Sequence, residues 1–204
     1  MIIQTEGIGK KFGREWIFKG FDYKFTSNKK YAITGKNGSG KSTLLKILAA
    51  AIPSSTGKVN YTNKNGEIVL PDKVFNYLTF MAPYMELIEE FSLHEFLTFY
   101  TNFKPLNIST NLLIEELRFS SAKNKQIRNF SSGMKQRLQL GLALFSKAEV
   151  VFLDEPTSNL DQYTSDWYLD TVMKTTNDRL VIISSNQQSE YVFCDEVIHL
   201  DEYK

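Results

Sequence analysis

The sequence lacks the features that mark secreted and membrane-spanning proteins. It has a single cysteine, Cys194, which excludes an internal disulfide framework and is typical of a reducing compartment. No apolar run approaches membrane-spanning length, and residues 1–6 lack the apolar stretch of a signal peptide. Internal repeats and low-complexity tracts are also missing. We therefore expect a soluble, cytoplasmic chain.

Positive and negative charges are also nearly balanced in the sequence. There are 24 Lys and Arg residues against 23 Asp and Glu residues, a formal net charge of +1. Nothing global therefore favours a nucleic-acid or anionic membrane surface, and we expect no nucleic-acid partner. The 204 residues suffice for one full core, or for one core with an inserted subdomain.

What the sequence does contain is a phosphate-binding loop between a predicted strand, residues 31–34, and a predicted helix. The loop, residues 35–42, reads GKNGSGKS and fits the pattern G-x-x-x-x-G-K-[ST] without mismatch. Its glycines let the backbone turn tightly, so that N–H groups and the positive end of the helix face phosphate oxygens. Lys41 is expected to reach the β- and γ-phosphates, and Ser42 to bind Mg²⁺. A chance glycine-rich turn is the alternative, and the flanking strand and helix disfavour it.

The first 30 residues alternate apolar and polar positions. Turn signals at Gly7, Gly9, Gly13 and Gly20 predict short antiparallel strands. Phe12 precedes the phosphate loop in the sequence and could stack on a nucleobase. Taken alone, Phe12 is more typical of a core residue, and Trp16 is a rival for the stacking role. Further strands are predicted at residues 58–61 and 77–81, with a hairpin turn at Asn65-Gly66 leading into residues 68–70.

The pattern changes from strand to helix over residues 83–145, which predicts an inserted helical subdomain. Ser92 and Glu95 form a capping box that opens a helix to about residue 100, and a second helix is predicted at 110–118. His94 lies inside the cap and is interpreted as structural. A further helix starts with the small residues of FSSGMKQR, residues 130–137, a second possible anion site that is a weak signal by itself.

A buried strand over residues 150–153 ends in two acids, Asp154 and Glu155, and Pro156 prevents its continuation. In a chain with a phosphate loop these acids are the expected partners of a metal and a water. Two acids on an exposed turn are the alternative, which the four apolar residues ahead of them disfavour. A turn at 158–161, a helix around 166–174 and strands at 180–183 and 197–200 complete an alternating α/β pattern, with His199 interpreted as structural.

Taken together, the order of motifs resembles the ATP-binding subunit of ABC transporters over essentially the full length. The phosphate loop matches completely, and residues 130–134 resemble the signature L-S-G-G-Q with Ser131 and Gly133 kept. Residues 150–155 match the apolar strand with Asp-Glu, and residues 158–161 resemble the S-A-L-D loop. Phe12 falls where the family has its adenine-stacking aromatic.

This resemblance implies an α/β fold with a P-loop NTPase core, an N-terminal antiparallel β subdomain and an inserted helical subdomain. The single ABC-type ATPase domain would span residues 1–204, with the core in 1–82 and 146–204 and the helical, signature-bearing part in 83–145. It also implies ATP and Mg²⁺, held in a head-to-tail homodimer, or a pair with another ABC ATPase subunit. In such a dimer two ATP molecules are bound, and each lies between the phosphate loop of one subunit and the signature helix of the other.

The implied site residues follow the family motifs. Ser42 and Asp154 would hold the metal, while Glu155, activating the attacking water, Lys41 and Asn186 would be catalytic. The implied nucleotide-binding residues are Phe12, Gly35, Lys36, Asn37, Gly38, Ser39, Gly40, Lys41, Ser42, Thr43, Ser131, Gly133, Met134 and Asp161.

Two departures from the family put the hydrolysis rate and its coupling to transport in doubt. The usual Gln is missing near Ala82, with Pro83 or Tyr84 in its place. Asn186 stands where the family has a His that contacts the γ-phosphate, and it could instead cap residues 187–190.

The first functional hypothesis is an ATPase subunit, peripheral on the cytoplasmic face of the membrane, that powers a separate transmembrane permease. The helical insert and residues 83–90 are expected to form the docking groove for that partner. The alternative is a slowly hydrolysing, ATP-gated regulatory or binding module of the same fold. A DNA-repair or chromosome ATPase of this superfamily would need a long coiled coil, which is absent from the sequence.

Overall fold

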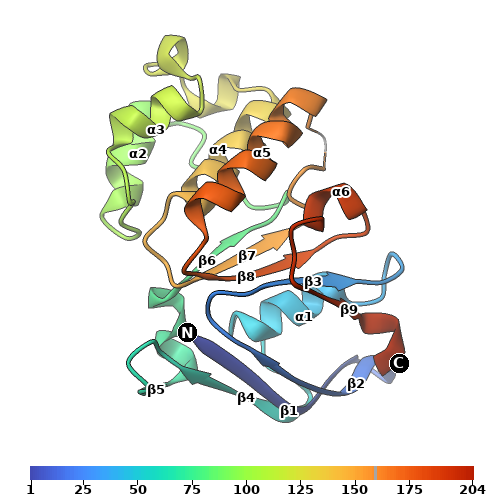
Figure 1. Ribbon diagram of the computed structural model, residues 1–204. Coiled ribbons are helices and arrows are strands. Elements are labelled where there is room, and N and C mark those ends of the chain that lie inside the picture. The colour runs from blue at the N-terminus through green and yellow to red at the C-terminus, as the bar shows by residue number, and fades with distance from the viewer. Residues whose placement is uncertain (159) are drawn as a thin grey trace. The chain divides into compact units, whose positions relative to one another are not determined.

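The computed structural model describes residues 1–158 and 160–204, which form two compact units (Figure 1). The first unit comprises Met1–Phe80, Ala148–Pro156 and Thr176–Lys204, and the second comprises Met81–Lys147 and Thr157–Thr175. The predicted helical segment, residues 83–145, lies within the second unit. That unit also takes in residues 157–175, which the sequence pattern places in the core.

The first unit contains an antiparallel sheet of four strands in the order β2-β1-β4-β5. Its strands are β1 (Ile2–Phe12), β2 (Glu15–Phe25), β4 (Thr56–Thr62) and β5 (Ile68–Val69). The prediction of several short strands in residues 1–30 is therefore wrong. Gly7 and Gly20 lie inside β1 and β2 with φ of 58° and 61°, next to shifts in the pairing register. These glycines allow β-bulges, whereas Gly13 makes the turn.

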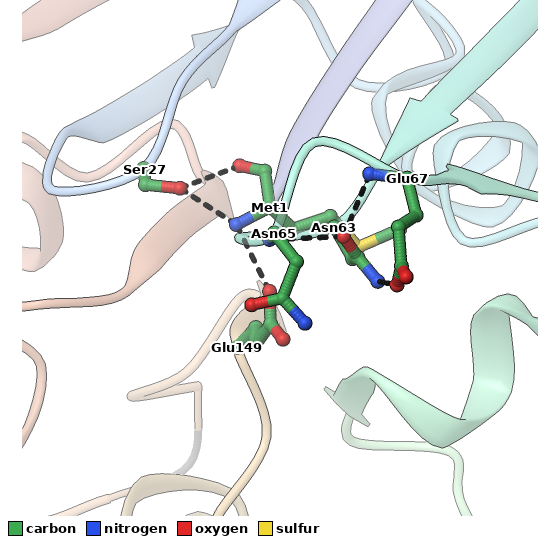
Figure 2. Close-up of polar contacts among 6 residues, drawn as sticks. All are labelled: Met1, Ser27, Asn63, Asn65, Glu67 and Glu149. Carbon is green, nitrogen blue, oxygen red and sulfur yellow. Dashed lines mark hydrogen bonds and ion pairs between the residues drawn. The ribbon is translucent and has the colours of Figure 1, made fainter.

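The predicted hairpin between β4 and β5 is confirmed. Asn63 Oδ1 accepts the N–H groups of Asn65 and Glu67 at 2.9 and 3.0 Å, and the two strands pair antiparallel. Figure 2 shows this turn together with a second group, in which the Met1 amine lies 3.1 Å from Glu149 Oε2 and donates to Ser27 Oγ. This second contact ties the start of β1 to the residue that precedes β7.

The other sheet has five strands in the order β6-β7-β8-β3-β9. They are β3 (Lys30–Thr34), β6 (Leu78–Met81), β7 (Val150–Asp154), β8 (Leu180–Ser184) and β9 (Glu196–His199). Every residue of β3, β7 and β8 is buried, as expected for strands covered on both faces. Helix α1 (Lys41–Leu48) packs between the two sheets and contributes Leu44, Leu45 and Leu48 to their common core (Figure 1).

Parallel pairing brings several strand ends to one edge of this sheet. Strands β7 and β8 pair Asp154 with Ser184, and β3 pairs Ile33 with Ser184 and Thr34 with His199. The segments that follow β3, β7, β8 and β9 therefore start side by side. The last strand ends at His199 rather than at the predicted residue 200, because η4 (Leu200–Tyr203) begins there. The remaining elements of this unit are η1 (Pro71–Asn76) and α6 (Gln188–Tyr191).

The second unit is helical. It contains α2 (Leu93–Thr101), α3 (Thr110–Glu116), η2 (Ser120–Ala122), η3 (Ile127–Asn129), α4 (Ser132–Leu144) and α5 (Gln162–Thr175). The capping box is confirmed, since Ser92 Oγ accepts the Glu95 N–H and the Glu95 carboxylate accepts the Ser92 N–H. Buried Leu and Phe side chains of α2, α3 and α4 form its core. Within the described part of the chain, no helix combines the length and hydropathy needed to cross a membrane.

Candidate functional site

The phosphate loop is shaped by three glycines in conformations that other residues avoid. Gly35, Gly38 and Gly40 have φ of 147°, 79° and 101°. Space is also limiting at Gly40, because an added Cβ would lie 2.2 Å from Ile17 Cγ2. Helix α1 starts directly after Gly40, so the N–H groups of its first turn have no acceptor within the helix. The loop and helix start therefore form a cradle of N–H donors.

The side chain of Lys41 folds back onto the phosphate loop. The residue is only 6% exposed, and its Nζ donates to Gly35 O at 2.8 Å and to Lys36 O at 3.3 Å. An ammonium has three donors, so two carbonyl contacts leave one N–H for a phosphate oxygen. Burial lowers the pKa of Lys41, and the charges of Glu155, Asp154 and Asp201 oppose that shift.

The two acids at the end of β7 differ sharply in environment. Asp154 is 2% exposed, whereas Glu155 is exposed and has a φ of 46°. A positive φ is uncommon for a residue with a Cβ and is found preferentially at functional sites. The Glu155 N–H donates to Ser184 O at 2.8 Å, which fixes this turn against β8.

A cavity of about 260 Å³ opens over the loop. It is lined by Ile17, Asn37, Gly38, Gly40, Lys41, Ser42, Thr43 and Glu155. The structure thus places Glu155 at the same cavity as the residues of the phosphate loop. Ile17 was missed because the alternation in β2 does not say which apolar residue faces the loop.

These residues fit a magnesium nucleotide. Lys41 and the N–H donors match phosphate oxygens, and the Ser42 hydroxyl and a buried carboxylate, Asp154, are ligands that Mg²⁺ accepts. Among the described residues no cluster of three His, Cys, Asp or Glu could hold a metal. Mg²⁺ suits such a site, because it keeps waters and substrate phosphates as most of its ligands.

Ser39 holds the loop together from within. Its N–H donates to Lys36 O at 3.0 Å, and its side chain is fully buried. An added Cβ at Gly35 would lie 2.8 Å from Ser39 Oγ, so with Ser39 in place no residue larger than glycine fits at position 35.

Asn186 reaches the phosphate loop. Its Nδ2 donates to Asn37 Oδ1 at 2.7 Å. The alternative interpretation, that Asn186 caps the next helix, is wrong: α6 has Gln187 at its N-cap, and the Gln187 N–H is bonded to Ser185 Oγ.

Phe12 is not a core residue, contrary to the interpretation of Phe12 taken alone. The residue is 56% exposed, with Lys10 Nζ 5.2 Å from the ring centroid. Phe12 ends β1 and is followed by the turn at Gly13, which places the ring at the end of the sheet. Trp16, the rival, is half-buried and has two lysines, Lys11 and Lys19, over its ring. Neither ring lines the cavity.

The signature residues belong to the second unit. Ser131 caps α4 by accepting the Met134 N–H at 3.2 Å, and the space around Gly133 is open. Asp161 Oδ1 accepts the Thr164 N–H at 2.8 Å, a bond that is typical of a helix N-cap. Hydrogen bonding from the Thr164 side chain, and then from this N–H, lowers the pKa of Asp161. The N-cap bond explains why α5 starts at Gln162, earlier than the predicted residue 166. Asn159 of the predicted turn at 158–161 lies outside the described residues.

Comparisons with known proteins point to one family. The chain is 25% identical over 210 residues to the linearmycin resistance ATP-binding protein LnrL of Bacillus subtilis, covering 98% of this chain and 67% of that protein. It is 28% identical over 167 residues to the lantibiotic transport ATP-binding protein SrtF of Streptococcus pyogenes, covering 78% of this chain and 69% of that protein. It spans only 8% of a retinal-specific phospholipid-transporting ATPase of Homo sapiens.

A similar fold is seen in a dimeric ATP-binding cassette solved in a post-hydrolysis state with ADP and Pi. The TM-score is 0.82 at 19% identity, and the likeness covers 97% of this chain and 93% of the cassette. Residues 18–158, more than half of the chain, match a family model described as ABC transporter. The chain therefore belongs to the ABC transporter family.

Proposed function

We propose that the chain is the ATP-binding and ATP-hydrolysing subunit that powers a separate membrane-spanning transporter through ATP-driven dimerisation. The observation that carries this proposal is the shared cavity, where Lys41 and Glu155 face the same space above the phosphate loop. One residue supplies a positive charge for phosphate, and the other supplies a carboxylate for the attacking water.

Each group at the cavity then has a distinct task. The N–H donors of the loop and Lys41 bind the phosphates and orient them for in-line attack. Ser42 and Asp154 would hold Mg²⁺, which supplies charge neutralisation on the phosphates when bound. Glu155 takes a proton from the attacking water. Phe12, with an exposed ring at the end of β1, would stack on the base.

The signature helix would act on the nucleotide of a second subunit. Ser131 is the N-cap of α4, and Gly133 and Met134 lie in its first turn. Asp161 caps α5 in the same unit. The exposed N-terminus of α4 can contribute N–H donors to a γ-phosphate held by the partner copy. The cassette with a similar fold is described as dimeric, which supports a dimer as the working form.

A hollow in the second unit is our proposed docking site for the transmembrane permease. It has a volume of about 270 Å³ and is lined by Pro83, Tyr84, Met85, Glu86, Leu87, Glu89, Ser132, Lys135, Gln136 and Gln139. Tyr84 and Met85 expose apolar surface there. The names of LnrL and SrtF, an ATP-binding protein of resistance and one of lantibiotic transport, support a role in transport.

A slowly hydrolysing ATP-gated module is a second candidate function, which Asn186 and the missing Gln favour. Asn186 cannot carry a charge to the γ-phosphate as His can. ATP turnover measured with and without the copurifying membrane protein separates the two functions. A subunit of a transporter is stimulated by its permease, whereas a gated module keeps its slow basal rate.

The test of the site is the Lys41→Ala variant in a calorimetric titration with MgATP. We expect binding to be abolished, because the cradle loses its buried positive charge. Lys64→Ala, a change of an exposed lysine on the β4–β5 hairpin, should bind like the parent. If Lys41→Ala binds ATP as tightly as the parent, the site assignment is wrong.

A further inference from the structure

We propose that Asp201 is a positioning residue for the phosphate loop, which orients the Gly35–Lys36 peptide and, through it, the ammonium of Lys41. The inference rests on the proposed function, because Lys41 acts there as the phosphate-binding charge. Asp201 belongs to η4, the short turn after β9, and not to the loop itself.

Asp201 and Lys41 bind the two polar groups of one peptide unit. The N–H of Lys36 donates to Asp201 Oδ2 at 3.0 Å. The C=O of the same peptide, that of Gly35, accepts the Lys41 Nζ bond at 2.8 Å. A carboxylate on the N–H side therefore fixes the plane of the peptide and polarises its carbonyl toward the ammonium. Rotating this peptide would break both contacts at once.

The carboxylate also limits the space around the loop. An added Cβ at Gly35 would lie 3.2 Å from Asp201 Oδ2, closer than most real contacts. Asp201 thus contacts the loop from the side opposite Lys41, while the cavity side stays open for a ligand.

Asp201 is itself held in place by the fold. Strand β9 pairs with β3 and aligns His199 with Thr34, whose hydroxyl lies 2.8 Å from His199 Nδ1. Leu200 is fully buried, and the ring of Tyr203 packs on Phe21 of β2 with centroids 4.7 Å apart. Figure 1 shows η4 at the end of β9, next to β2. The turn is therefore anchored on both sides of the aspartate.

The charge of Asp201 agrees with this role. The Lys36 N–H bond is the main reason why the pKa of Asp201 is lowered, and Lys204 Nζ lies 3.5 Å from the other carboxylate oxygen. Asp201 is therefore ionised at neutral pH, and its negative charge adds to the electrostatic hold on Lys41.

Asp195 offers a matched control. Its Oδ2 accepts the Lys30 N–H at 2.7 Å, the same kind of bond at the other end of β3. Removing Asp195 costs β3 one carboxylate–amide bond, at Lys30, whereas removing Asp201 costs the phosphate loop one such bond, at Lys36. Only the loss of Asp201 disturbs the phosphate loop.

The experiment compares Asp201→Ala, Asp201→Asn and Asp195→Ala with the parent in the full chain. Calorimetry gives the ATP affinity with Mg²⁺, and amide hydrogen exchange of Lys36 without nucleotide reports the peptide directly. We expect Asp201→Ala to weaken ATP binding and to speed Lys36 exchange, each by about three- to tenfold, the loss expected for one hydrogen bond. Asp201→Asn keeps an acceptor oxygen and should restore part of both. Asp195→Ala should leave the ATP affinity within about twofold of the parent.

ATP affinity in Asp201→Ala equal to that of the parent, or to that of Asp195→Ala, would overturn the inference. Unchanged Lys36 exchange in Asp201→Ala would overturn it too. A parent chain that does not bind ATP contradicts the proposed function instead, while Lys36 exchange still decides whether Asp201 holds the peptide.

Discussion

Asn186 is the residue whose identity we expect to bear most directly on the rate of the proposed ATP hydrolysis. It donates its amide to Asn37 of the phosphate loop, a residue that lines the cavity. An amide offers a neutral hydrogen bond, whereas the histidine found in the family can carry charge and take up a proton. The position is therefore suited to touch a bound nucleotide, but with a weaker group.

We predict that Asn186→His raises kcat roughly 3- to 30-fold with KM nearly constant. This range is the difference between a charge-assisted hydrogen bond, about 1.5–3 kcal/mol, and a neutral one, about 1 kcal/mol, converted to a rate. Steady-state ATP turnover of the isolated chain provides the measurement.

Asn186→Ala is the control for this prediction, because it breaks the Asn37 contact without adding an imidazole. Its kcat should fall below that of the parent. An unchanged or lower kcat in Asn186→His would mean that Asn186 does not stand in for the histidine.

At the scale of elements, the sequence predicted those features that depend on local signals. The phosphate loop, the acids after β7 and the capping box of α2 each need only neighbouring residues, and each was found in its expected element. Gly7 and Gly20 show the limit, since a glycine at a bulge and a glycine at a turn look alike in sequence.

Features that depend on pairing between distant strands could not be predicted. Asp201 meets Lys36 because β9 lies beside β3, and Ile17 meets Gly40 because β2 runs past the loop. The Asn37–Asn186 contact likewise needs β3 and β8 to be neighbours. Nothing within a short window of sequence carries this information.

Helix α4 contains two glycines whose roles are expected to differ. An added Cβ at Gly141 would lie 2.7 Å from Leu117 Cδ2, in the core of the second unit. At Gly133, in the first turn, nothing lies within 4 Å of an added Cβ. One glycine thus serves packing, and the other leaves the signature backbone open.

We predict that Gly141→Ala lowers the free energy of unfolding by about 1 kcal/mol, because overpacking outweighs the better helix propensity of Ala. Gly133→Ala should change stability by less than about 0.5 kcal/mol. It should nevertheless reduce ATP turnover at least about tenfold, since its methyl group would keep the partner's phosphate from the helix start. Urea unfolding and turnover assays measure the two effects. A stable Gly133→Ala variant with full turnover would contradict the proposed role of the signature.

At the scale of the whole molecule, the site residues are divided between two units. Lys41, Ser42, Asp154, Glu155 and Asn186 belong to the first unit. The signature residues and Asp161 belong to the second. Such a division suits a site that is completed by a second copy when ATP binds. In the proposed dimer, hydrolysis would then release the two copies.

This dimer model makes Glu155→Gln the most informative variant. The change removes the proposed general base, and it also removes a negative charge from the cavity proposed to receive the phosphates. Glutamine matches the size of glutamate and would adopt the same φ of 46° at position 155, so the turn after β7 should persist. We therefore expect ATP to double the mass measured by light scattering for this variant, while the parent returns to monomer as it hydrolyses. Lys41→Ala combined with Glu155→Gln should stay monomeric, because it cannot hold ATP. A Glu155→Gln variant that remains monomeric at saturating ATP would count heavily against the dimer.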